Sequence, residues 1–172
     1  MSRCVMLSIR PEWCRKMLSG EKKIEIRKSR PKIETPFKCY IYQTLPKWGD
    51  WNESDGHVVG EFICDWIKDF GFSPYFEDGH HGSYHGIVDI HKLSCVSFED
   101  MFEYIGERYG FGWHISGIKR YKHPKHLHEF ELACDRVDCK SCKRYDAEKR
   151  KCNRTMMRPF QSWGYVEELH DE

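Results

Sequence analysis

The sequence predicts an α+β domain in which short strands dominate and form a small closed or partly closed β-barrel. About five to seven strand-like runs are separated by turn residues, and about two short helical patterns lie between them. The chain length agrees, because 172 residues suffice for one core but not for two without a linker. We therefore expect a single domain over residues 1–172, with residues 131–158 as an insert.

The first predicted elements are a strand, a helix and a second strand. Residues 4–9 form an apolar run, and Pro11 is a favoured first residue for a helix that would end at Gly20. In residues 23–27, isoleucines alternate with charged residues, as in a strand with one apolar face and one charged face.

The rest of the chain continues this pattern of short elements. Ser97 followed by Asp100 resembles a helix capping box, so residues 98–110 are predicted to be helical, with Met101 and Ile105 on the buried side. The remaining strand-like runs are residues 37–44, 57–67, 86–94, 113–121 and 162–169.

Composition limits the possible functions. Hydrophobic residues make up 40% of the chain and aromatic residues 15%, so the chain is expected to fold unaided. The formal net charge of +1 gives no overall attraction to nucleic acid, so any such binding depends on a local patch or pocket. Because no apolar run resembles a secretion signal or a membrane span, we expect a cytoplasmic protein with no membrane partner.

A short motif follows the first predicted helix. Gly20, Lys22, Glu25 and Arg27 form the pattern G-x-K-x-x-E-x-R. This pattern resembles the signature of the ASCH family in the PUA-like superfamily, and the neighbouring runs resemble strands of phage and bacterial ASCH proteins. The resemblance implies a PUA-like small β-barrel with flanking short helices. The segments that carry it are most of residues 3–130 and residues 160–169.

The resemblance also implies a cleft, lined by the motif strand, that binds RNA or a modified nucleotide. Lysine offers a point charge to phosphate, arginine a planar fork to phosphate or a base edge, and a carboxylate accepts from an exocyclic amine. Without the resemblance, the pattern is typical of ion pairs on a solvated strand face. Trp163 is a candidate for base stacking or for packing. The predicted nucleic-acid-binding residues are Arg10, Lys22, Glu25, Arg27, Lys28 and Trp163.

Two other classes of function stay open, namely a hydrolase and a protein-interaction module. Some ASCH proteins are amidohydrolases that act on acetylated cytidine through a threonine, a lysine and a carboxylate; Lys22 matches the lysine, but Glu25 occupies the threonine position. A ribonuclease with Lys22 and Glu25 as acid and base is a second hydrolase alternative. The other interpretation is a phage accessory protein that binds a protein partner through the cysteine insert, Trp48 and Trp51.

Four of the nine cysteines lie close together near the C-terminus, in the pattern C-x₄-C-x₂-C-x₉-C. This spacing predicts a structural zinc site of the zinc-knuckle type, because a C-x₂-C pair places two sulfurs on one metal and four protein ligands leave no position for water. The other five cysteines, dispersed among apolar residues, are predicted to be buried. The predicted ligands are Cys134, Cys139, Cys142 and Cys152, with His123, His126 or His128 as an alternative to one cysteine.

Overall fold

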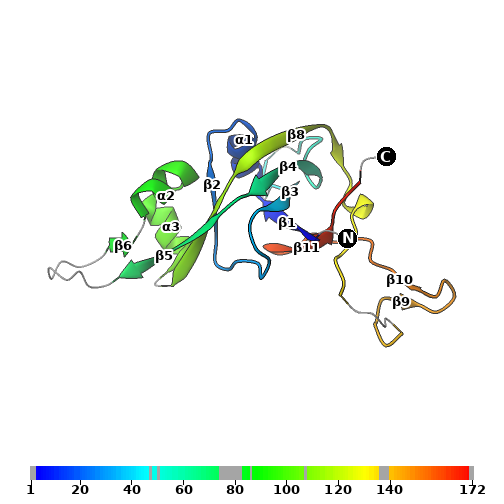
Figure 1. The fold of residues 1–172 in the computed structure, drawn as a ribbon. Helices are drawn as coiled ribbons and strands as arrows, with labels where there is room; N and C mark the ends of the chain where they lie inside the picture. Colours follow the sequence, from blue (N-terminus) through cyan, green and yellow to red (C-terminus); the bar gives the residue numbers. More distant parts are fainter. Residues whose placement is uncertain are drawn as a thin grey trace.

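The structure is a computed structural model whose strands form two packed sheets with short helices beside them (Figure 1). Within the part of the chain that it describes, no helix is both long enough and apolar enough to cross a membrane. The described residues are 3–46, 48–49, 51–73, 83–85, 87–106, 108–135 and 140–170.

The N-terminal segment forms the predicted strand and helix. Most of β1 (Arg3–Ile9) is buried, since it pairs with a strand on either side. The helix α1 (Pro11–Leu18) begins at the proline and buries Cys14 and Met17. Gly20 follows with φ +78°, a backbone conformation that only glycine adopts without steric cost, and it redirects the chain into the next strand.

The larger sheet has five strands in the order β11-β1-β3-β4-β8. β1 and β3 run parallel, and the other neighbours are antiparallel. The predicted strand over residues 113–121 is divided in the structure: residues 113 and 114 end β7 (Tyr109–His114) of the second sheet, and the edge strand β8 begins at Ser116 and continues beyond residue 121. The other members of the larger sheet are β3 (Phe37–Gln43), β4 (Val58–Cys64), β8 (Ser116–Lys125) and β11 (Trp163–Glu167).

The smaller sheet has four antiparallel strands in the order β2-β7-β5-β6. The chain visits this sheet twice, first at β2, between α1 and β3, and then from β5 to β7, between β4 and β8 (Figure 1). Among the described strands no ladder closes the barrel, which is therefore open. The members are β2 (Ile24–Arg27), β5 (Ile67–Ser73), β6 (Ser83–His85) and β7 (Tyr109–His114).

The predicted cap of the third helix is confirmed. The Ser97 hydroxyl accepts a hydrogen bond of 3.0 Å from the amide of Asp100, and α3 (Phe98–Ile105) buries Met101 and Ile105. The helix is shorter than the predicted residues 98–110, because Gly106, with φ +68°, ends it.

The prediction of a strand over residues 86–94 is wrong, because this segment contains α2 (Ile87–Ser94). Its β-branched residues favoured a strand, but α2 packs on β2 and buries Ile90 against Ile24 and Phe70. Tertiary packing therefore outweighed the local preference.

The core lies mainly between the two sheets. Trp113 of β7 is fully buried there, among residues of the larger sheet and of α1. The cysteines predicted to be buried are buried, except for Cys95, which is partly exposed. The buried ones are Cys4, Cys14, Cys39 and Cys64.

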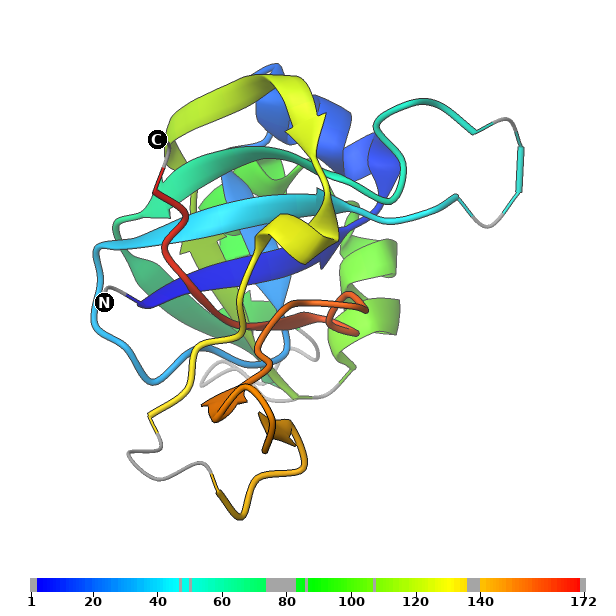
Figure 2. The same cartoon turned by 90° about the vertical axis from the view of Figure 1, so that its right-hand side faces the viewer.

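The cysteine-containing segment lies apart from both sheets (Figures 1 and 2). It follows the short 3₁₀ helix η1 (Leu127–Glu129) and contains the hairpin of β9 (Tyr145–Asp146) and β10 (Lys151–Cys152). Figure 2 also shows the segment between β3 and β4 projecting from the body. Trp48, 91% exposed, and Trp51 lie on that segment.

Candidate functional site

The motif strand β2 is buried on both faces. Ile24 and Ile26 pack against α2 and α3, as the alternation predicted. Glu25 and Arg27 point the other way but are also buried, because the larger sheet covers that face. The interpretation of these residues as ion pairs on a solvated face is therefore wrong.

Arg27 joins the two sheets through its guanidinium. One terminal nitrogen donates to the carbonyl and hydroxyl oxygens of Ser162, both at 3.2 Å, and the other donates to the carbonyl of Ser8 at 3.0 Å and to Glu25 Oε1 at 2.9 Å. Its Nε is buried and has no hydrogen-bond partner among the described residues. A ligand oxygen would reach this donor only if a neighbouring group moved.

Lys22 lies beside this pair and is only 1% exposed. Its Nζ donates to the carbonyl of Ser94 at 2.6 Å, lies 3.4 Å from Glu25 Oε2 and sits 5.0 Å from the centre of the Trp13 ring. Burial lowers the pKa of Lys22 below its ordinary value of 10.5, while the Glu25 carboxylate opposes that change. A ligand would reach this ammonium only if the Ser94 carbonyl moved.

The lowered pKa of Lys22 predicts a measurable dependence of stability on pH. Between the lowered pKa and 10.5, the unfolded chain binds the lysine proton more tightly, so stability rises with pH in that window. Lys22→Met removes this contribution and leaves Glu25 paired with Arg27. We therefore expect the free energy of unfolding of the wild type, relative to Lys22→Met, to increase from neutral pH towards 10.5 in urea titrations. A constant difference between the two proteins would contradict the lowered pKa.

Two exposed cations and a partly exposed ring border the buried pair. Arg10 and Lys28 are exposed, and Tyr104 of α3 is 40% exposed. Lys28 Nζ lies 4.8 Å from the centre of the Tyr104 ring. Burial raises the pKa of Tyr104, Glu25 raises it further, and Arg27 and Arg10 lower it, so all three charges act on its hydroxyl. Sequence analysis missed Tyr104, because only the fold brings α3 to this strand.

Trp163 belongs to the same region but is partly buried. Its indole nitrogen donates to the Ser29 hydroxyl at 3.0 Å, and its ring packs 5.7 Å from Trp113 and 5.6 Å from Tyr165. Packing therefore accounts for much of its surface. Base stacking on Trp163 stays a prediction.

A second basic surface lies on the edge strand β8. Residues 117–125 contain four lysine or arginine residues and no acidic residue, the same number as the shorter basic segment of residues 26–32. Arg120 and Lys122 are exposed, and α1 packs beside the strand. The net charge of the whole chain does not reveal this basic surface, but the cluster of lysine and arginine residues in the sequence does.

The histidines before the insert form a group of their own. His57 Nε2 lies 3.1 Å from His126 Nδ1, and the His126 ring stacks on His128 with centres 5.1 Å apart. His126 thus contacts the turn before β4. Its replacement of a cysteine at the insert stays a prediction.

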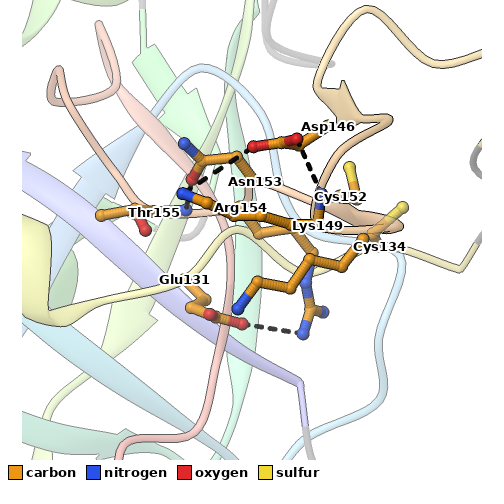
Figure 3. Close-up of a pocket in the computed structure, with 9 residues that line it drawn as sticks. Glu131, Cys134, Asp146, Lys149, Cys152, Asn153, Arg154 and Thr155 are labelled. Atoms are coloured by element: carbon orange, nitrogen blue, oxygen red, sulfur yellow. Dashed lines mark hydrogen bonds and ion pairs between the residues drawn. The ribbon is translucent and has the colours of Figure 1, made fainter.

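The cysteine segment contains a pocket of about 450 Å³ (Figure 3). Cys134 and Cys152 both line it, as does Arg154, which pairs with Glu131 at 2.7 Å. Cys139 lies outside the described residues. Among those that are described, no group of three or more histidine, cysteine or acidic side chains is arranged to hold a metal ion.

Comparison with solved structures shows which known fold this chain resembles. The chain resembles the crystal structure of ASCH from Zymomonas mobilis, with a TM-score of 0.52 and 16% identity over 72% of this chain and 73% of the other. A tyrosine-to-phenylalanine mutant of that protein gives a TM-score of 0.51 at 17% identity, covering 72% and 75% of the chains. A serine-to-alanine mutant gives 0.51 at 18% identity, covering 72% and 73%.

The protein therefore has an ASCH-type, PUA-like fold, as the motif predicted. No model of a known protein family matches the sequence. No curated protein matches it either.

Proposed function

We propose that this protein binds RNA or a modified nucleotide at the surface formed by Arg10, Lys28 and Tyr104 beside the buried pair of Glu25 and Arg27. The observation that carries the proposal is that two exposed cations and a partly exposed ring gather round the motif strand. Cations attract phosphates, and a base stacks on an aromatic ring beside them. An ASCH-type fold with this motif supports the same function.

The buried residues have a separate part in this proposal. Arg27 has an unpartnered Nε, which a ligand oxygen would reach only if a neighbouring group moved. Lys22 and Glu25 hold the guanidinium in place, because Glu25 bonds both cations and Lys22 is closed off by Ser94. Trp163 borders the site through its contact with Ser29.

One observation favours a hydrolase as the second candidate. Burial lowers the pKa of Lys22, and its Nζ lies 3.4 Å from the Glu25 carboxylate. A lysine with a lowered pKa exchanges protons more readily near neutral pH, as an acid or base acting on RNA or a nucleoside must. This function requires the Ser94 carbonyl to move away from Lys22.

The test is a titration of fluorescent single-stranded RNA with purified protein at several salt concentrations. The variant Arg10→Ala/Lys28→Ala removes both exposed cations of the site, and Arg120→Ala/Lys122→Ala removes the same two residue types from β8 as a matched control. We expect the site variant alone to bind more weakly. The slope of log affinity against log salt should fall by about 1.4, which corresponds to two lost phosphate contacts on a single strand.

The outcomes separate the candidate functions. Loss of binding in the β8 variant but not in the site variant would place RNA on β8 and overturn the proposal. If the RNA is cleaved, or an acetylated nucleoside is hydrolysed, and Lys22→Met abolishes turnover, the hydrolase is favoured. If the wild type neither binds nor cleaves, a protein partner that contacts Trp48 and Trp51 becomes the better hypothesis.

A further inference from the structure

The cysteine segment has no hydrophobic core of its own. Among its described residues from 131 to 155, none is buried. The strands β9 and β10 contain only 2 residues each. A two-stranded hairpin of this size is at best marginally stable in water. Some other interaction must therefore hold the segment in one conformation.

The base of the segment brings two cysteines to one pocket. The amide of Met156 donates to the Phe130 carbonyl at 2.9 Å, and the amide of Leu132 donates to the Arg154 carbonyl at 2.8 Å. These bonds flank an antiparallel bridge between residues 131 and 155. Cys134 follows this bridge by three residues on one side, and Cys152 precedes it by three residues on the other. Both side chains line the same pocket (Figure 3).

The hairpin brings a third cysteine towards this pair. Tyr145 lies opposite Cys152 in the β9–β10 ladder. The amide of Tyr145 also donates to the carbonyl of Cys142 at 2.9 Å, so the chain turns back at this point. Cys142 therefore lies at the start of the hairpin and is hydrogen-bonded to Tyr145, the residue that pairs with Cys152.

We propose that Cys134, Cys142 and Cys152 bind a structural Zn²⁺ ion. The spacing of Cys139 to Cys142 assigns Cys139, which lies outside the described residues, as the fourth ligand. Four thiolates on Zn²⁺ carry a net charge of about −2, and the surrounding chain compensates for it. Residues 140–155 contain seven lysine or arginine residues against two acidic ones.

The metal takes the place of the missing core. Binding releases the thiol protons, and the free energy of binding becomes free energy of folding for this segment. Four protein ligands leave no open position, so the site is structural and not catalytic. A disulfide between Cys134 and Cys152, which line the same pocket, is the alternative, but it would not involve Cys139 and Cys142.

The test is to measure the zinc content of the purified full-length protein by elemental mass spectrometry. We expect one zinc ion per chain in the wild type, and loss of stoichiometric zinc in Cys142→Ser and Cys152→Ser. Cys95→Ser is the matched control, since Cys95 is also partly exposed but lies outside the segment, and it should retain the metal. Cobalt substitution of the wild type should give the absorption of tetrahedral thiolate coordination, which does not depend on how the variants fold.

Hydrogen exchange gives a second measurement on the wild type. Removing zinc with a chelator should expose the amides of residues 140–153 to exchange, while β1 and β3 keep their protection. Wild-type protein without zinc whose intact mass is lower by two hydrogens would show a disulfide and overturn the proposal. Zinc retained by both segment variants would overturn it as well.

Discussion

Replacing Arg27 with alanine lowers the free energy of unfolding by about 3–5 kcal/mol, the cost typical of breaking a buried ion pair. Its guanidinium is buried and joins β2 to Ser8 and Ser162 of the larger sheet. The substitution removes the guanidinium donors from the carbonyls of Ser8 and Ser162 and leaves Glu25 with only the longer contact to Lys22. The Ser162 carbonyl still accepts from the Ser8 amide at 2.9 Å, so the buried Glu25 carboxylate carries most of the cost.

Chemical denaturation of Arg27→Ala beside the wild type measures this loss. Arg15→Ala is the control, because Arg15 is exposed on α1 and alanine favours helix. We expect the control to change stability by about 0.5 kcal/mol or less. If Arg27→Ala behaved like the control, the guanidinium would be solvated, and it would not support the proposed site as a fixed buried residue.

Replacing Trp113 with alanine has an effect of similar size, about 3–5 kcal/mol of lost stability. Trp113 is 0% exposed and packs edge-on against Phe37, with ring centres 5.8 Å apart. It belongs to the smaller sheet but fills the core of the larger one. The cavity left by alanine would therefore lie where the two sheets meet.

Two further variants make this second prediction specific. Trp113→Phe should cost less than Trp113→Ala, because the indole nitrogen has no hydrogen-bond partner among the described residues and phenylalanine keeps part of the volume. Tyr109→Ala, in the same strand but 71% exposed, should cost about 1 kcal/mol or less. Equal losses from Trp113→Ala and Tyr109→Ala in thermal or urea unfolding would contradict the packing of Trp113 between the sheets.

Local signals in the sequence were enough for much of the fold. Pro11 and Gly20 bound α1, and Ser97 caps α3, because each of these effects acts within a few residues of the chain. The motif from Gly20 to Arg27, together with the ordered set of segments around it, predicted the ASCH-type fold. The same kind of local information failed for α2, where β-branched residues favour a strand in isolation.

The candidate site was only partly predictable. The sequence identified Lys22, Glu25 and Arg27 as a group, and the structure places both cations within 2.9–3.4 Å of the Glu25 carboxylate. It could not supply Tyr104 of α3, nor could it distinguish a buried network from a solvated face. Both facts depend on which segments cover β2.

The sequence by itself therefore determined the local elements, the motif and the cysteine spacing, since these depend on neighbours along the chain. Only the tertiary structure decided that the charged face of β2 is buried, that Arg27 bonds to Ser162, and that Cys134 and Cys152 line the same pocket. The physical reason is distance along the chain: Arg27 and Ser162 are 135 residues apart, and contacts of this kind form only when the two sheets pack together.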